Sequence, residues 1–320
     1  MKPLINPIPA ELIEKELTSD KFVRPTNFGN NCIYIFNYHT APNTTLEVGR
    51  LRELAFRKAG GGTGKSYDLD KYDLQNVPYS QLIVWSPEEK VILGGYRFLK
   101  CSDAPVAENG DIQLATYKLF KFSQKFIKDY FPYTIELGRS FVHPNFQTGQ
   151  SDRKSIFALD NLWDGLGAIT VDHPEIRYFF GKVTMYTHYN QEARNLLMYF
   201  LQKHFPSKDE LLTLIDPLPL NIDHKKYEKI FIYDDYTEDR KILNAEIRKL
   251  GENIPPLINA YMNLSPSMQI FGTSINHDFG GVEETAIMID LHDIYKSKSD
   301  RHIKSYLEYK QSILSKKISE

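Results

Sequence analysis

The sequence predicts an α/β (α+β) fold in which a central mixed sheet is flanked by helices and followed by a C-terminal extension. Three observations predict it. Two apolar runs, residues 81–85 and 91–99, are separated by a proline-containing turn and are typical of a strand hairpin. Residues 133–144 (YTIELGRSFVHP) include an alternating stretch between two prolines, which is typical of a central strand. Residues 153–168 and 190–204 carry apolar side chains at helical spacing.

The other elements follow from apolar spacing and from capping residues. In chain order they are a strand at 32–38, a helix from Thr44 or Thr45 to Lys58, a short helix at 123–131, a polar loop at 145–152 and a strand at 178–186. Asn190 caps the last helix and Pro206 stops it. Strands and helices thus alternate along the chain, which is typical of an α/β protein.

Composition and charge exclude several classes of protein. A chain of 320 residues, 42% hydrophobic and 25% charged, can form a substantial core. A net charge of −2 argues against a general nucleic-acid binder, so we expect no nucleic-acid partner. The sequence has no apolar run of about 18 residues and no secretion signal, so we expect a cytoplasmic protein. No histidine pair has a metal-ligand spacing, which predicts that no metal is bound.

Residues 59–66 (AGGGTGKS) satisfy a loose phosphate-loop expression, but their context contradicts it. A phosphate-binding loop follows a strand and begins a helix, so that backbone N–H groups meet the phosphates. Here a predicted helix precedes the glycines, and the acidic segment 67–73 follows them. We therefore expect a mobile glycine loop that binds neither ATP nor GTP.

Gly138, inside the central strand, predicts a β-bulge or a close approach of backbone or ligand. Glu136 and Arg139 point to opposite faces of a regular strand. A bulge at Gly138 would change the register and bring both side chains to one surface. A surface ion pair on the sheet is the alternative interpretation.

Five motifs occur in order along the chain. They are LRELAF at 51–56, DKYD at 70–73, GYRFL at 95–99, ELGRS at 136–140, and a C-terminal set made of IPPLI at 254–258, YMNL at 261–264 and the glycine-bearing segment 277–281. In this order they resemble the acyl-ACP-dependent amino-acid N-acyltransferases of the GNAT fold, which make ornithine and glycine lipids and are often labelled hemolysin-like. Acyl-homoserine lactone synthases share much of the N-terminal constellation, whereas the C-terminal set is similar to the lipid-making group.

The resemblance covers about residues 46–290 and implies both organisation and function. It implies a lead-in segment at 1–45, a GNAT-like core at 46–205, a C-terminal part packed on the core at 206–295 and a basic amphipathic tail at 296–320. The implied reaction moves a (3-hydroxy)fatty acyl group from acyl carrier protein to the α-amine of glycine or ornithine, in aminolipid biosynthesis. An autoinducer synthase and a non-enzymatic, hemolysin-like membrane-active protein are the alternatives.

The candidate site residues lie mostly in these motifs. The candidates for catalysis are Glu136, Gly138 and Arg139, and the candidates for substrate binding are Arg52, Phe56, Asp70, Asp73, Arg97 and Trp163. An α-ammonium is mostly protonated at neutral pH, and amide formation needs a neutral amine, so Glu136 is the candidate general base. A backbone N–H freed at Gly138 can stabilise the oxyanion. The arginines can hold a carboxylate or carrier group, or they can form structural ion pairs with the aspartates.

The donor and the acceptor can also be weighed from the residues. Residues 147–152 (QTGQSD) are a degenerate version of the coenzyme A loop of GNAT enzymes, and Asp152 is unfavourable for a pyrophosphate. We therefore expect no bound cofactor, with acyl-phosphopantetheine on a carrier protein as co-substrate. Ornithine would need an acid for its δ-ammonium. If arginines already pair with Asp70 and Asp73, only Asp68 is left, which favours glycine or another small neutral amino acid.

Residues 296–317 combine basic and apolar side chains. The basic residues are Lys296, Lys298, Arg301, Lys304, Lys310, Lys316 and Lys317, with Ile303, Tyr306, Leu307, Ile313 and Leu314 between them. This tail can dock an acidic carrier protein or make peripheral contact with the inner face of the membrane, although a solvated terminal helix is the more common outcome.

Overall fold

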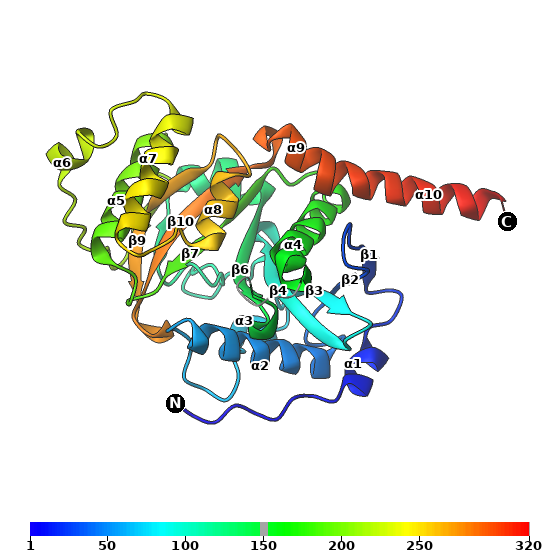
Figure 1. The fold of residues 1–320 in the computed structure, drawn as a ribbon. Helices are drawn as coiled ribbons and strands as arrows, with labels where there is room; N and C mark the ends of the chain where they lie inside the picture. Colours follow the sequence, from blue (N-terminus) through cyan, green and yellow to red (C-terminus); the bar gives the residue numbers. More distant parts are fainter. Residues whose placement is uncertain (148–152, 320) are drawn as a thin grey trace.

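The computed structural model describes residues 1–147 and 153–319 and is organised around an eight-stranded sheet (Figure 1). The strands are β1 (Phe22–Pro25), β2 (Cys32–Phe36), β3 (Ser80–Ser86), β4 (Val91–Lys100), β6 (Thr134–Val142), β7 (Tyr178–Met185), β9 (Gln269–Asn276) and β10 (Val282–Asp290). Their order in space is β1-β2-β3-β4-β6-β7-β10-β9. All neighbours are antiparallel except β6 and β7, so the predicted mixed sheet is confirmed. The short strands β5 (Phe120–Phe122) and β8 (Leu212–Leu214) pair separately.

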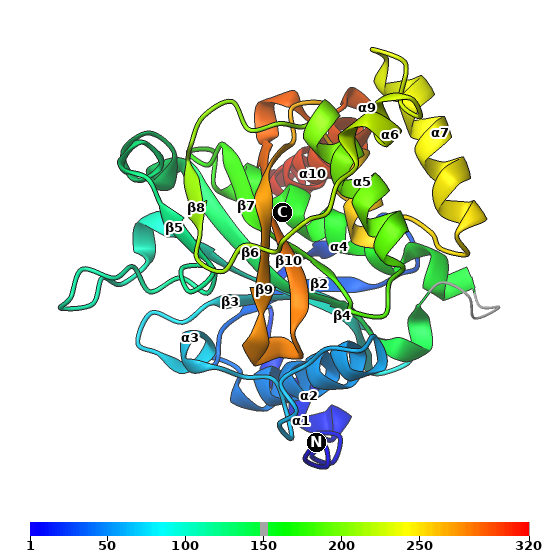
Figure 2. The same cartoon turned by 90° about the vertical axis from the view of Figure 1, so that its left-hand side faces the viewer.

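Helices cover both faces of this sheet (Figures 1 and 2). They are α1 (Ala10–Glu16), α2 (Pro42–Lys58), α3 (Lys71–Leu74), α4 (Arg153–Asp172), α5 (Gln191–His204), α6 (His224–Glu228), α7 (Tyr236–Lys249), α8 (Pro256–Met262), α9 (Lys296–Ser299) and α10 (Ser305–Ser319). The alternation along β3 separates two cores. Leu82 and Val84 pack with α4, α5 and α8, whereas Ile83 and Trp85 pack with α2.

The predicted hairpin is confirmed as β3 and β4, the central strand as β6, and the helix predicted at 190–204 as α5, with Asn190 as its N-cap. The helix predicted from Thr44 begins earlier, at Pro42, because proline suits a first helical turn. Its free N–H groups are satisfied from another helix. The Glu16 carboxylate accepts hydrogen bonds from the N–H groups of Asn43 (3.0 Å) and Thr44 (2.7 Å). The short helix predicted at 123–131 is a π-helical turn, η2 (Phe126–Tyr130), followed by a 3-10 turn.

The predicted bulge is present in β6, but it lies one residue beyond Gly138. Arg97 pairs with Gly138 and Gly95 pairs with Phe141, so two residues of β6, Arg139 and Ser140, face Tyr96 alone. Arg139 takes the left-handed conformation (φ +50°), and Gly138 does not. The expectation that the glycine itself forms the bulge is therefore wrong. An arginine holds this conformation because its side chain is fixed on both sides, as described below.

The C-terminal part joins the same sheet. Strand β10 pairs with β7, and β9 pairs with β10, so strands from both sides of the predicted boundary at residue 205 share one ladder. The chain ends in α10, which extends away from the body (Figure 1). Among the described helices, none is both long enough and apolar enough to span a bilayer. Of the polar loop predicted at 145–152, residues 148–152 lie outside the described part of the chain.

Candidate active site

A cavity opens where the parallel pairing of β6 and β7 ends. The two strands pair from Thr134 and Tyr178 as far as Leu137 and Gly181. The next residues of both strands line a cavity of about 450 Å³, its open mouth included. Phe56 of α2 closes it from one core and Tyr261 of α8 from the other, so the cavity passes between the two layers at a gap in the sheet.

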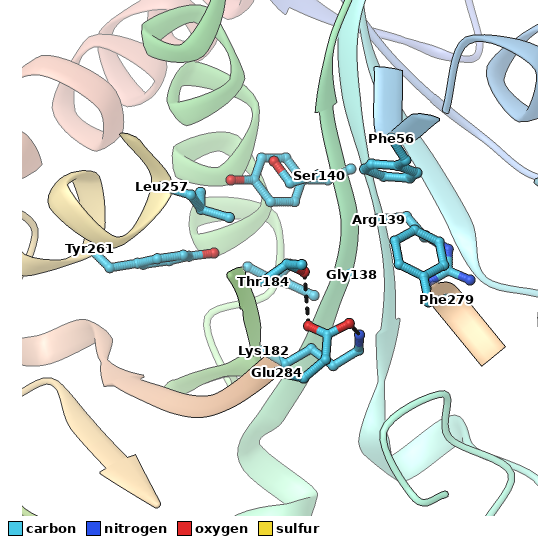
Figure 3. A pocket seen from close by; sticks show the side chains of 12 residues that line it. Phe56, Gly138, Arg139, Ser140, Lys182, Thr184, Leu257, Tyr261, Phe279 and Glu284 are labelled. Carbon is cyan, nitrogen blue, oxygen red and sulfur yellow. Dashed lines mark hydrogen bonds and ion pairs between the residues drawn. The ribbon is translucent and has the colours of Figure 1, made fainter. Parts of the chain in front are cut away.

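The polar side of the cavity is formed by β7 and β10 (Figure 3). Glu284 is an ion-pair partner of Lys182, and its Oε2 accepts a hydrogen bond from the Thr184 hydroxyl (2.8 Å). Asn276 donates a further hydrogen bond to Oε1 (3.2 Å). Burial lowers the pKa of Lys182, although the Glu284 charge opposes that shift. The result is an ordered carboxylate and an ammonium side by side in the cavity.

Arg139 and two phenylalanines form the opposite wall (Figure 3). The Arg139 guanidinium lies 4.4 Å from the ring centroid of Phe279. Its Nε lies 2.7 Å from Oδ2 of Asp68, a fully buried carboxylate. These two contacts hold the strained residue of the bulge, and they place a cation at the cavity wall.

Glu136, the predicted base, is absent from the cavity lining. Its carboxylate is only 1% exposed, and it accepts a hydrogen bond from the Tyr79 hydroxyl and another from the Thr116 N–H (2.9 Å). The Tyr79 hydroxyl in turn accepts a bond from the Ala115 N–H (3.0 Å). Burial raises the pKa of Glu136, although these hydrogen bonds and the Arg97 charge oppose the shift. Glu136 therefore does not contact this cavity, and its role as a general base stays a prediction.

The remaining charged candidates form one network of ion pairs, which consists of Arg52, Asp70, Asp73 and Arg97. Arg97 Nη1 lies 2.9 Å from Asp70 Oδ1 and 2.9 Å from Asp73 Oδ2. Arg52 binds the other oxygen of Asp73 (3.2 Å) and donates to Gln81. Burial alone would raise the pKa of Asp70, but Arg97 holds it well below its usual range. The alternative of structural ion pairs therefore describes Arg52 and Arg97, while Arg139 both pairs and lines the cavity.

Trp163 does not line the cavity, but it contacts Tyr261, which does. Its ring packs edge-on against Tyr261 with the centroids 5.4 Å apart. It lines a second, apolar cavity of about 280 Å³, mouth included, between α4 and the residues after α9. The structure thus brings Phe56, Gly138 and Arg139 to the main cavity, and leaves Glu136, Arg52, Asp70, Asp73, Arg97 and Trp163 outside its lining.

Sequence reasoning missed Lys182, Thr184 and Glu284. The signal for them is weak, because polar and apolar residues are mixed in both strands: YFFGKVTM for β7 and VEETAIMID for β10. A charged residue in a central strand is costly to bury without a partner. The register of β7 and β10, in which Thr184 faces Glu284, brings those partners together.

The arrangement supports transfer of an acyl group. A bulge interrupts the hydrogen bonds of the ladder and can leave backbone N–H groups available to an oxyanion. A carboxylate can accept a proton from an amine, and a neighbouring cation can hold an anionic group. In this cavity the bulge follows Gly138, Glu284 is the carboxylate, and Lys182 and Arg139 are the cations.

Comparison with known proteins agrees with this chemistry. Residues 51–155 match the family described as "Acetyltransferase (GNAT) domain". The fold and the site therefore define an acyltransferase of the GNAT class.

Two curated proteins named "Glycine N(alpha)-acyltransferase" are closely similar to this chain. The protein of Phocaeicola vulgatus is 53% identical over 308 residues, which is 96% of this chain and 94% of the relative. The protein of Bacteroides thetaiotaomicron is 54% identical over 308 residues, 96% of this chain and 91% of the relative. The chain belongs to the family of these two acyltransferases.

Solved structures show a more distant similarity. The acyl-homoserine lactone synthase BjaI, solved with SAM and isopentyl-CoA, has 11% identity and a TM-score of 0.37, over 86% of this chain and 89% of that one. The synthase LasI has 13% identity and a TM-score of 0.34, over 61% of this chain and 86% of that one.

Proposed function

We propose that this protein transfers a (3-hydroxy)fatty acyl group from an acyl carrier protein to the α-amine of glycine, in the synthesis of an aminolipid. The cavity at the end of the β6–β7 ladder carries this proposal, because it combines a bulge, a carboxylate and two cations within an aromatic wall. The names of the two relatives support glycine as the acceptor.

The charges around the cavity favour a small neutral amino acid. Asp70 and Asp73 are paired with Arg97 and Arg52, and Asp68 is paired with Arg139. Glu284, the carboxylate that lines the cavity, already has Lys182 as its partner. The δ-ammonium of ornithine would therefore be buried without an acid of its own, and that costs several kcal/mol. The carboxylate of glycine, in contrast, finds Arg139 in the lining, whose guanidinium has N–H donors besides the Nε that contacts Asp68.

The donor is a thioester, and the phosphopantetheine arm of a carrier protein is our proposed co-substrate, with no cofactor resident in the protein. The amine nitrogen attacks the thioester carbonyl carbon, and the C–S bond breaks after the tetrahedral intermediate has formed. The freed backbone N–H groups of the bulge would stabilise the oxyanion of that intermediate. The pantetheine thiol leaves with one proton, and one further proton goes to solvent.

The test uses the purified full chain with 3-hydroxyacyl carrier protein and, in parallel, the matching acyl-CoA. Each donor is combined with glycine, with ornithine or with S-adenosylmethionine, and N-acyl products are quantified by mass spectrometry. We expect N-acylglycine as the main product, with kcat/KM for glycine about tenfold or more above ornithine, a difference of at least about 1.4 kcal/mol.

Other outcomes revise the proposal in defined ways. A higher kcat/KM for ornithine would mean that an acid does face its δ-ammonium. Formation of a lactone from S-adenosylmethionine would identify an autoinducer synthase. A higher kcat/KM for acyl-CoA than for the acyl carrier protein would overturn the choice of donor.

A further inference from the structure

The buried glutamates of β6 and β10, Glu136 and Glu284, differ in what they face. Glu284 lines the cavity, whereas Glu136 points into a closed hydrogen-bonded cluster with Tyr79 and Thr116. Building on the proposed function, we propose that Glu284 is the catalytic residue that accepts the proton of the substrate amine, and that Lys182 is its positioning residue.

The hydrogen bonds of Glu284 leave room for a substrate. Its Oε1 accepts from Lys182 and Asn276, while its Oε2 accepts from Thr184 and from no other described residue. A carboxylate offers about four acceptor sites, so Oε2 retains one for an amine N–H or a bridging water. Figure 3 shows this carboxylate between Thr184 and Lys182 in the cavity.

Rigid elements hold the pair. Lys182 and Thr184 belong to β7 and Glu284 to β10, two interior strands that pair along the whole of β7. Catalytic groups on strands are placed more accurately than groups on loops. Glu136 also lies on a strand, but its hydrogen bonds are to Tyr79 and Thr116, and Tyr79 is bonded in turn to the N–H of Ala115.

Several charged or titratable groups face Glu284. Lys182 and Arg139 are cations in the same lining, and Tyr261 of α8 faces the cavity from the other side. Tyr186, just after β7, has its pKa raised to about 12 by burial and by the Glu284 charge. The described part of the cavity lining thus places two cations beside Glu284 and no second carboxylate.

The proton balance of the reaction is simple. Glu284 takes one proton from the α-ammonium and passes it to solvent, which leaves a neutral amine. That amine attacks the carbonyl, forms the C–N bond and loses a second proton, and the departing thiolate takes up one proton as the C–S bond breaks. The products are N-acylglycine, the free carrier thiol and one released proton.

The test compares two carboxylate variants and a matched control in the assay with acyl carrier protein and glycine. We expect Glu284→Gln to lower kcat about 100-fold or more, the usual size of lost general-base catalysis, with an unchanged KM for the acyl carrier protein. Glu136→Gln should keep kcat within about threefold and lower the melting temperature. Glu283→Gln is the control, because Glu283 is the next residue of β10 and pairs with Arg194 (2.6 Å) outside the cavity. Its kcat should be unchanged.

Two further readouts separate catalysis from structure. Lys182→Met should move the acid limb of the kcat/KM profile to higher pH, because removing the adjacent cation raises the pKa of a carboxylate. A purely structural Lys182 would leave that limb in place. The double variant Lys182→Met/Glu284→Gln has no unpaired buried charge, so it gives the answer if Glu284→Gln alone fails to fold. If it also fails to fold, the conservative Glu284→Asp decides by its kcat.

The inference is overturned if the folded Glu284→Gln or double variant keeps kcat within about fivefold of the wild type, or if Glu136→Gln shows the 100-fold loss instead. Failure of the proposed function gives a different result, because the wild type would then form no N-acylglycine. In that case the amine that the wild type does acylate replaces glycine in the same comparison.

Discussion

Asp70 connects the buried arginine network to solvent. Its side chain is 28% exposed, whereas Asp73 and Arg97 beside it are at most 2% exposed. Both of its carboxylate oxygens accept hydrogen bonds from Arg97 at 2.9 Å, and its Oδ1 also caps α3 through the Tyr72 N–H. These bonds need the ionised form of Asp70, so the network is stable only where that carboxyl is charged.

The free energy of unfolding should therefore fall at acid pH because of Asp70. Its pKa is lowered on folding, so its contribution to stability is present above its ordinary pKa of 3.8 and is lost as the pH falls below that value. We expect Asp70→Asn to be less stable than the wild type at pH 7, with a difference that shrinks between pH 4 and pH 2. Urea unfolding across this range measures it.

A control variant completes this comparison. Glu308→Gln changes a carboxylate of α10 whose side chain is 64% exposed, and it should alter stability little at any pH. Parallel stability curves for the wild type and Asp70→Asn would show that Asp70 does not carry the acid sensitivity.

Single residues also show where prediction from sequence ends. Arg139 could be predicted as a site residue, and it does line the cavity. Its left-handed backbone could not, because the contacts that hold it come from Asp68 and Phe279, far apart in the chain. Glu136 lies in a recognisable motif, yet its hydrogen-bond partners Tyr79 and Thr116 come from segments that the motif does not include.

At the scale of elements, the glycine loop after α2 binds an internal carboxylate with its backbone N–H groups. The buried Glu53 carboxylate accepts hydrogen bonds from the N–H groups of Thr63 (3.0 Å) and Gly64 (2.7 Å), and from the Thr63 hydroxyl (2.7 Å). Arg57 pairs with the same carboxylate (2.8 Å). The loop that the sequence predicts to be mobile is thus attached to the helix before it, and its N–H groups serve an internal carboxylate.

This geometry predicts that ATP and GTP do not bind. Millimolar nucleotide should leave the melting temperature of the protein unchanged within about one degree, because a bound ligand would raise it by mass action. Lys65→Ala should behave like the wild type in the same scan. A nucleotide-dependent rise of several degrees that disappears in Lys65→Ala would contradict the prediction.

Elements were predictable where one local signal dominated. Strand β6 alternates between prolines, and α5 has both a capping Asn190 and a regular apolar stripe. Strand β10 was not predicted, since Glu283 and Glu284 interrupt its apolar pattern at the start. Those glutamates are tolerated only because Arg194 and Lys182 are brought beside them by the tertiary fold.

At the scale of the whole molecule, the C-terminal segment consists of two parts. In the first, His302 is bonded to Asp164 (2.7 Å) and Tyr306 donates to Asp172 (3.0 Å), which fastens the segment to α4. Both residues are at most 5% exposed. In the second, the later part of α10 leaves the body, and Leu314 is 58% exposed. Lys310 marks the end of the first part, because it still pairs with Asp172 of α4 (2.7 Å).

Two shortened chains should therefore behave differently. A chain that ends at Lys310 should keep the melting temperature of the full chain within about two degrees, because it removes little buried surface. A chain that ends at Ser299 loses the buried side chains of His302 and Tyr306. It removes one hydrogen-bond partner of Asp164, which keeps Asn27, and it removes both Tyr306 and Lys310 from Asp172. This chain should therefore melt many degrees lower or fail to fold.

If the exposed end of α10 makes peripheral membrane contact, the full chain should sediment with vesicles that contain anionic lipid at low salt. It should sediment less at 0.5 M salt, since screening weakens the attraction of lysines to the headgroups. The chain ending at Lys310 should sediment less, with an unchanged KM for the acyl carrier protein. Equal sedimentation of both chains would remove the membrane role from residues 311–320, and a raised KM would assign them to carrier docking instead.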